Sequence, residues 1–321
     1  MKLVTEVSCL RPERPLGLDE PVCLLGSCFS DEMGRKLSDA GFRVLANPFG
    51  TLYNPASIAA AVARLDDPVP FREEDCVPLG AGDGRTGSFF HHTSFARSTA
   101  AEFLKAANAC LAQATGEWER CGAVILTLGT ARVWRALERP GRPVVANCLK
   151  RPAREFAHEL LSVEECTRLL RGIVETHPQK RFILTVSPIR HLGEGAHVNS
   201  VSKATLHLAV EHILTSFADG RSLPDGAAGN YFSDRLAEKP ISDPPSAVGE
   251  SPRVEYFPAY ELLLDELRDY RFYAEDLVHP SPTAVELIWE RFLATYAAPA
   301  DLPRIRENEK AARAARHRPI R

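Results

Sequence analysis

Val22-Cys23-Leu24-Leu25-Gly26-Ser27-Cys28-Phe29 predicts a short apolar strand that ends at Gly26 and is followed directly by a helix. The amphipathic run Asp31–Leu37 continues that helix, so Ser27 and Cys28 are expected at its N-terminus. Exposed backbone N–H groups and the positive end of the helix dipole stabilise negative charge there, on a thiolate or on a developing oxyanion. The turn is therefore a candidate position for a nucleophile.

Other runs of the same kind predict the rest of the fold. Short apolar runs, typical of strands buried on both faces of a sheet, recur at Ala123–Leu128 and Arg181–Val186, and a further strand is predicted at Val254–Phe257. Apolar residues at three- and four-residue spacing predict helices at Ala56–Leu65, Ala100–Ala114, Ser162–Val174, Ser202–Phe217, Tyr260–Leu267 and Thr283–Tyr296. Ser162 and Glu165 form a candidate capping box. This alternation predicts an α/β fold, a three-layer α/β/α sandwich with a mainly parallel sheet and ligands at the carboxyl ends of its strands.

The predicted organisation is one domain, at residues 22–296, with additions at both ends. Residues 1–21 form an N-terminal extension and residues 297–321 a basic C-terminal tail, expected to be solvated or frayed. Residues 219–252 are rich in Gly, Pro, Ser and Asp without a clear period, which predicts a mobile loop or an inserted cap.

Composition excludes several classes of protein. The 321 residues are 45% hydrophobic and 25% charged, enough to bury a full core, and the net charge of −3 gives no reason to expect nucleic acid as a partner. No run approaches the ~18 apolar residues that span a bilayer, and Met1–Glu6 lacks the apolar core of a secretory signal. We therefore expect a cytoplasmic location. The oligomeric state is left open.

Cysteine and glycine patterns give no sign of a metal or a cofactor. The eight cysteines are scattered without a Cys-x-x-Cys pair, which favours reduced thiols over disulfides or structural zinc. Gly26-Ser27-Cys28 is not a dinucleotide fingerprint, and no phosphate-binding Gly-x-x-x-x-Gly-Lys loop occurs. Neither a cofactor nor a metal is predicted.

Asp276-Leu277-Val278-His279-Pro280-Ser281 supplies an acid and a base near the end of the chain. A nucleophile followed by a late Asp-x-x-His predicts acyl transfer or hydrolysis. His279 is the candidate base, or the imidazolium partner of a thiolate, and Asp276 would hold its tautomer. Cys28 is favoured over Ser27 as nucleophile, because a lowered thiol pKa needs less help from the site. The alternative for Cys28 is a small buried hydrophobe without reactivity.

Two basic clusters, His91-His92 and Arg190-His191, are candidate substrate-binding residues. Adjacent residues on an extended segment point to opposite faces, so one of each pair is expected to reach a given site. Arg190 follows a predicted strand and could hold a substrate carboxylate or phosphate. Metal ligands and ordinary surface residues are the alternatives, and the spacing argues against a metal.

Seven segments, in order, resemble the GSCFA domain family: Gly26–Phe29, Asn47–Pro55, Thr127–Trp134, Ala146–Cys148, Thr185–Leu192, Asn199–Leu206, and Asp269–Tyr273 with His279–Ser281. That family is similar to the SGNH, or GDSL-type, hydrolases, which have a flavodoxin-like sandwich, an early nucleophile and a late Asp-x-x-His. The resemblance sets Cys28 at the nucleophile position and Ser27 in place of an acidic residue.

The resemblance also implies an oxyanion hole, the group of donors that stabilises a tetrahedral intermediate. Gly50 stands for the glycine of the second conserved block. The third block has Gly129-Thr130 without the usual asparagine, so Thr130 or Asn147 would replace it, and Gly129 could equally be a plain strand terminator.

The sequence thus predicts an esterase or acyltransferase that works through a covalent acyl-enzyme on a small-molecule or carbohydrate acyl substrate. Two alternatives stay open. Ser27 could be the nucleophile, or the domain could bind an acylated or carbohydrate ligand without turnover. The acyl donor and acceptor are not predicted.

Overall fold

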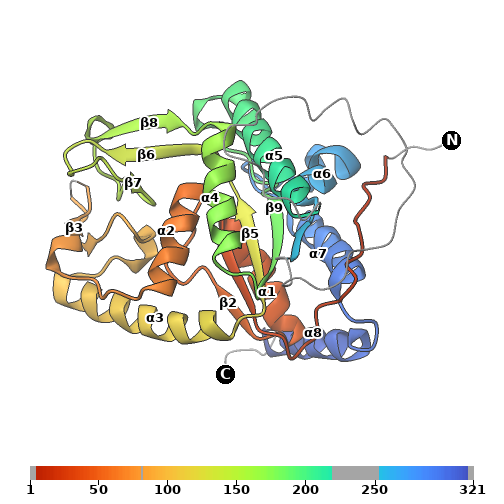
Figure 1. Cartoon of the computed structure of the whole chain (residues 1–321). Coiled ribbons are helices and arrows are strands. Elements are labelled where there is room, and N and C mark those ends of the chain that lie inside the picture. Colours follow the sequence, from red (N-terminus) through yellow and green to blue (C-terminus); the bar gives the residue numbers. More distant parts are fainter. Residues whose placement is uncertain (1–4, 81, 219–252, 317–321) are drawn as a thin grey trace.

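The computed structural model describes residues 5–80, 82–218 and 253–316. Its centre is a five-stranded sheet with the strand order β10-β9-β5-β1-β2, in which all neighbours are parallel (Figure 1). The strands are β1 (Val22–Gly26), β2 (Val44–Ala46), β5 (Ala123–Leu128), β9 (Arg181–Val186) and β10 (Arg253–Tyr256). The four strands expected from apolar runs are present, and the short β2 is an addition.

Helices cover both faces of the sheet. One face packs against α2 (Pro55–Asp66), α3 (Ala100–Arg120), α4 (Val163–Glu175) and α5 (Ala196–Ala218). The other packs against α1 (Cys28–Ala40), α6 (Ala259–Glu261) with the π-helical turn Leu262–Leu267, α7 (Pro282–Tyr296) and α8 (Leu302–Arg316). The predicted three-layer α/β/α sandwich is confirmed.

Burial on both sides explains why β1 has no polar face. In β1, Cys23 and Leu25 join the core of the first face, while Val22 and Leu24 join that of the second. All five residues of the strand are buried. A continuous apolar run is the pattern that such a strand requires.

Most helix predictions hold, with shifted ends. The Ser162–Glu165 capping box is confirmed: Ser162 Oγ accepts from Glu165 N at 3.1 Å, and Ser162 N donates to Glu165 Oε2 at 2.8 Å. Helix α5 begins six positions before the predicted Ser202, at Ala196, and α3 extends beyond the predicted Ala114 to Arg120.

Small elements decorate the sandwich and were not predicted. A three-stranded antiparallel sheet is formed by β6 (Arg132–Ala136), β7 (Val144–Val145) and β8 (Phe156–Leu160), and a hairpin by β3 (Val77–Pro78) and β4 (Thr86–Gly87). Single 3₁₀ turns occur at Glu73–Asp75, Thr93–Phe95, Ala153–Glu155, Leu192–Glu194 and Tyr270–Phe272. The strands of the small antiparallel sheet are short and half exposed, so they lack the apolar runs that predicted the central sheet.

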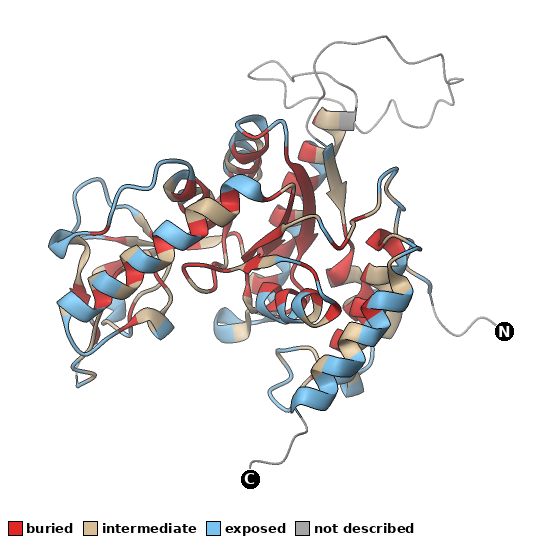
Figure 2. Ribbon diagram, turned by 90° about the horizontal axis from the view of Figure 1, so that it is seen from below, coloured by how far each residue is buried: buried red, intermediate tan, exposed pale blue. Residues whose placement is uncertain are grey.

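The ends of the chain pack more closely than expected. The tail predicted to be solvated forms α8, which is largely exposed but buries Ile305 completely (Figure 2). Asn308 Nδ2 in α8 donates to the carbonyl of Ala40 at 2.9 Å, at the end of α1. In the N-terminal extension, Leu16 is fully buried and its N–H donates to the carbonyl of Tyr296 at 2.6 Å. The predicted loop or cap at 219–252 lies outside the described residues.

The order in which the chain adds strands to the sheet reverses after β1, beside the predicted nucleophile. From β1 the chain goes to β2 on one side and later returns to β5 on the other. Helices that leave neighbouring strands in opposite directions open a crevice at their carboxyl ends, where ligands of open α/β sheets bind. Ser27 and Cys28 follow β1 at this position. No helix in the described ranges is both long enough and apolar enough to cross a membrane.

Candidate active site

The turn after β1 places Cys28 at the first position of α1. Ser27 is the N-cap, with its Oγ accepting from the N–H of Phe29 at 3.3 Å. Gly26 has φ +150°, and its N–H donates to Asn47 Oδ1 at 2.9 Å. The N–H of Cys28 is one of the helix N-terminal donors that have no intrahelical acceptor. A partly exposed thiol therefore lies at the N-terminal donors of a helix, as the sequence predicts.

The late Asp-x-x-His faces this thiol from the loop before α7. Cys28 Sγ lies 3.6 Å from Nε2 of His279, and the other ring nitrogen, Nδ1, lies 2.6 Å from Asp276 Oδ2. Asp276 Oδ1 also accepts the N–H groups of Val278 and His279, at 2.9 and 3.0 Å. Leu277 turns the chain between them with φ +56°. The structure thus brings together the residues predicted as nucleophile, base and acid.

Hydrogen bonds and burial shift the pKa values of Asp276 and Cys28. The backbone N–H of His279, with that of Val278 and the imidazole, lowers the pKa of Asp276 to about 2, so the carboxylate is ionised. An ionised Asp276 favours a proton on Nδ1 and leaves the Nε2 lone pair facing sulfur. Burial raises the pKa of Cys28 above its ordinary value, and Asp31 and Glu32 add to this, although its own N–H acts in the opposite direction. This direction differs from the lowered thiol pKa expected from the helix dipole, because desolvation and the acidic first turn of α1 outweigh it.

A raised pKa makes the reactivity of Cys28 depend on pH. The thiolate fraction grows with pH, and a raised pKa shifts this increase to higher pH. We expect the rate of Cys28 alkylation by iodoacetamide, followed by mass spectrometry of the Cys28 peptide, to rise without a plateau from neutral pH to about pH 9. A plateau already reached at acidic pH would indicate a thiolate–imidazolium pair instead.

Ser27 does not share this environment. Its side chain is fully buried, and Oγ lies 3.0 Å from Oγ of Ser187, which follows β9. The Ser27 hydroxyl also accepts from Phe29 N. It therefore caps α1 and links the segments that follow β1 and β9. No hydrogen bond connects Ser27 with His279 among the described residues.

We therefore expect Ser27→Ala to lower the unfolding free energy of the protein, with a smaller effect on its activity. Loss of an N-cap costs about 1 kcal/mol of unfolding free energy, and loss of the buried hydrogen bond between the Ser27 and Ser187 hydroxyls adds a similar amount. Urea unfolding would measure this loss, while ester turnover at a temperature where the variant is folded should change less than about tenfold. A loss of turnover as large as that of Cys28→Ala would identify Ser27 as the nucleophile.

The predicted oxyanion donors have their backbone N–H groups engaged elsewhere. Gly50 N donates to Asn47 O at 2.8 Å, and both Gly129 N and Thr130 N donate to the carbonyl of Tyr53, at 2.9 and 2.8 Å. Asn147 Oδ1 accepts from Leu149 N, and its side chain does not line either cavity beside Cys28. Of these four residues, Thr130 alone lines one of the two cavities beside Cys28, with its hydroxyl 2.8 Å from that of Ser202.

Asn54 is a donor that the sequence interpretation missed. It caps α2, with Oδ1 accepting from Ser57 N at 2.8 Å, and it lines the same cavity as Cys28 and Thr130. With Oδ1 engaged, the Nδ2 group is the part of the amide left for a ligand. The pair Asn54-Pro55 is a helix-start signal, and that role concealed its position in the site.

The two basic clusters separate in the structure. His91 is fully buried among aromatic rings, with Nδ1 2.7 Å from Ser88 Oγ, and burial lowers its pKa to about 3. His92 contacts Ser94, and neither histidine lines a cavity beside Cys28. Arg190 and His191 do line one, so of the two clusters only the second remains a candidate for substrate binding in that cavity.

That cavity, here called the β6–β8 cavity, has a volume of about 410 Å³. Trp134 and His158 stack in its wall with ring centroids 3.9 Å apart, and Glu194 pairs with both His158 and Arg132. Arg190 lies 4.0 Å from the ring centroid of Tyr273 and forms no ion pair with a described residue. The complete lining is Cys28, Tyr53, Asn54, Thr130, Arg132, Trp134, Val145, Ala146, His158, Ile189, Arg190, His191, Gly193, Glu194, Val198, Asn199, Ser202, Val278 and His279.

Lys203 interacts electrostatically with Cys28 and was not predicted as a site residue. It is almost completely buried, and its Nζ donates to the carbonyls of Gly129 and Ser187 at 2.6 and 2.7 Å. Burial lowers its pKa to about 7. These bonds join the ends of β5 and β9. Within the described ranges, no group of three or more His, Cys, Asp or Glu residues has the arrangement of a metal site.

The GSCFA family model matches residues 21–224 and 245–292, so the chain belongs to the GSCFA family. This confirms the resemblance found in the sequence motifs. A search of curated proteins found no significant match. Among solved structures, the chain is similar to BT4096, described as a gut microbial diltiazem-metabolizing enzyme, with 10% sequence identity and a TM-score of 0.38. The similarity covers 88% of this chain and 48% of that one, so the chain spans about half the length of that protein.

Proposed function

We propose that this protein is an ester hydrolase or acyltransferase in which Cys28 forms a covalent thioester with the acyl group. The observation that carries the proposal is the alignment of Cys28 Sγ, His279 and Asp276 at a helix N-terminus, with distances of 3.6 and 2.6 Å. A nucleophile within reach of a base that a third group orients is the arrangement that covalent acyl transfer requires.

In the first half-reaction, the thiol proton moves to Nε2 of His279 while sulfur attacks the substrate carbonyl carbon. The carbonyl electron pair moves onto oxygen, and the N–H of Cys28 and the amide of Asn54 are our candidate donors to that oxyanion. Collapse of the intermediate breaks the ester C–O bond, and the leaving alkoxide takes the proton from Nε2. The products are an alcohol and a thioester at Cys28.

In the second half-reaction, water or an acceptor alcohol gives its proton to Nε2 and attacks the thioester carbonyl. The thiolate leaves and recovers the proton, which restores the enzyme. Because the raised pKa of Cys28 favours the neutral thiol at rest, His279 acts as a general base in the first step rather than as a preformed imidazolium.

The β6–β8 cavity is proposed to bind the alcohol or acceptor part of the substrate. Arg190 has no carboxylate partner among the described residues, whereas Glu194, the one acidic residue in the lining, is paired with Arg132 and His158. A guanidinium without a carboxylate partner in the described part of the chain favours a substrate that carries a carboxylate or a phosphate. The resemblance to SGNH hydrolases agrees with this proposal, and a cytoplasmic location stays a prediction.

Intact-mass measurement after exposure to p-nitrophenyl acetate and to a fluorophosphonate tests the proposal. We expect an acetyl adduct on the wild type that is absent from Cys28→Ala and accumulates less in His279→Ala. An adduct that disappears only with Ser27→Ala would move the nucleophile by one residue. No adduct and no turnover with either reagent would contradict catalysis and favour a domain that only binds an acylated or carbohydrate ligand.

A further inference from the structure

A second cavity touches the same reacting atoms from the other side. This α1–α7 groove, with a volume of about 440 Å³, is lined by Cys28, Phe29, Glu32, Arg35, Lys36, Ile189, His279, Pro280, Pro282, Val285 and Glu286. It shares Cys28, Ile189 and His279 with the β6–β8 cavity. Cys28 and His279 therefore lie between two separate cavities. A substrate carbonyl bound at sulfur would direct one of its two substituents into each cavity.

The groove is apolar next to the thiol. Phe29 and Val285 are almost completely buried, at 1% and 6% exposure, and Ile189 is 4% exposed. Pro280 and Pro282 complete this part of the lining and have no backbone N–H to offer a ligand. A polar ligand would find few partners here, whereas an alkyl chain would lose water from its surface.

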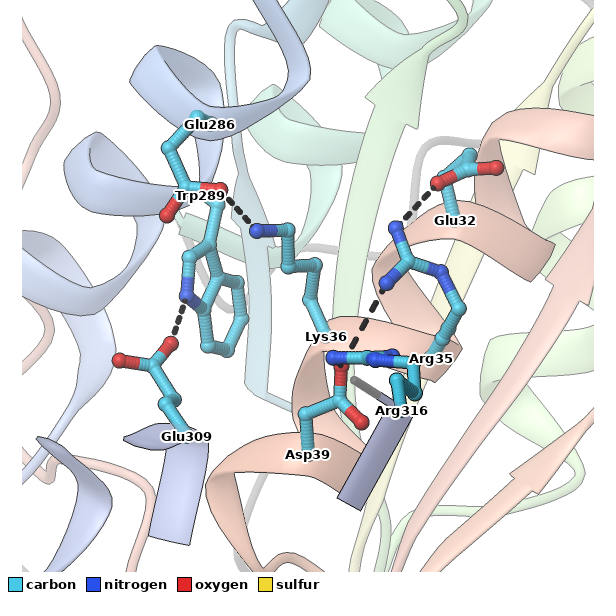
Figure 3. A network of polar contacts seen from close by, with 8 residues as sticks. All are labelled: Glu32, Arg35, Lys36, Asp39, Glu286, Trp289, Glu309 and Arg316. Carbon is cyan, nitrogen blue, oxygen red and sulfur yellow. Dashed lines mark hydrogen bonds and ion pairs between the residues drawn. The ribbon is translucent and has the colours of Figure 1, made fainter. Parts of the chain in front are cut away.

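The charged residues at the edge of the groove are already paired with one another. Figure 3 shows Lys36 of α1 joined to Glu286 of α7, and Arg35 joined to Glu32 at 2.8 Å. Asp39, outside the groove, adds a second partner to Arg35 at 3.4 Å and accepts from Arg316 at 2.8 Å. All four charges in the lining are thus balanced, in contrast to Arg190 in the β6–β8 cavity.

We infer that the α1–α7 groove binds the acyl chain of the substrate, as an uncharged alkyl group, while the alcohol or acceptor occupies the β6–β8 cavity. This inference rests on the proposed function. The apolar lining next to sulfur, the balanced charges and the shared Cys28 and His279 carry it. Balanced charges offer a ligand no net attraction, so the occupant of this side is selected by apolar surface.

The inference predicts a preference for longer acyl chains. Each methylene that enters apolar surroundings favours binding about fourfold, so octanoyl esters should react with a higher kcat/KM than acetyl esters. The measured quantity is the ratio of kcat/KM for p-nitrophenyl octanoate to that for p-nitrophenyl acetate. A ratio does not depend on the fraction of each preparation that is folded.

Val285 is the residue to change, because it lines the groove from α7 and is not itself one of the three residues of the proposed triad. We expect Val285→Phe, which fills the groove, to lower the octanoate-to-acetate ratio at least tenfold, and Val285→Ala, which widens it, to leave the ratio unchanged or raise it. Leu287→Phe is the matched control: it adds a ring to the same helix at an exposed position, 39% accessible, outside the groove. Its ratio should equal that of the wild type.

The outcomes separate the inference from the function. Turnover of acetate with a ratio that Val285→Phe does not alter would overturn the groove assignment and leave the proposed function intact. A ratio that falls with Trp134→Ala instead would place the acyl chain in the β6–β8 cavity and also overturn it. Absence of turnover and of an acyl adduct with both esters would overturn the function and the inference together.

Discussion

Cys28→Ala is expected to lower kcat/KM for p-nitrophenyl acetate by a factor of about 10³ or more, to the level of background hydrolysis. The variant keeps the N-cap of α1 and both cavities, so substrate binding survives while the group that forms the thioester is gone. Initial rates measured with wild type and variant at equal concentrations test this expectation.

Two further variants show whether the loss comes from chemistry. His279→Ala should lose a comparable factor, because the thiol with a raised pKa then has no base, and Cys28→Ala,His279→Ala should lose little more than either change alone. Additive losses would mean that the two residues act independently. A Cys28→Ala variant that retains wild-type turnover would refute the assignment outright.

Gly26→Ala is expected to have the largest effect on stability, about 3 kcal/mol or more of unfolding free energy. Gly26 has φ +150°, and a Cβ atom there would lie 2.2 Å from the carbonyl oxygen of Thr127 in β5. That oxygen also accepts the N–H of Ser27 at 3.1 Å, so the clash falls on backbone atoms that position the nucleophile turn. Urea unfolding monitored by far-UV circular dichroism measures the loss.

Gly172→Ala is the matched control for this change. Gly172 lies in the exposed face of α4, and a Cβ atom built there meets no heavy atom within 4 Å. Alanine should therefore stabilise the protein by about 0.5–1 kcal/mol, because glycine in a helix interior is unfavourable. Equal effects of the two substitutions would show that the strand end tolerates a side chain.

The central sheet could be predicted because its strands have one simple property. Strands β1, β5 and β9 are buried on both faces, so each appears as a short run composed mainly of apolar residues. The sheet β6–β8 has no such property. Trp134 and His158 line a cavity, and their neighbours in the same strands face solvent or pair with charges, so no periodicity marks them.

The geometry of the candidate site could be predicted where a few adjacent residues determine it, and not where tertiary contacts do. The turn at Ser27-Cys28 and the Asp276–His279 turn are each set by a few adjacent residues. Gly50 and Gly129 were expected as oxyanion donors, but their N–H groups bond to other carbonyls, which only the folded loops decide. Lys203 is similar: its burial depends on the packing of α5 against the ends of two strands.

Helix α8 holds α1 and α7 together at contacts far from Cys28. Asn308 and Arg316 bind the end of α1 opposite Cys28, and Glu309 accepts from Trp289 Nε1 of α7 at 2.6 Å. The 13 residues of α1 separate those contacts from the thiol by about 20 Å. A lesion in the tail would therefore resemble a folding defect, open to rescue by stabilising osmolytes, whereas a lesion at Cys28 would leave a well-folded but inert molecule.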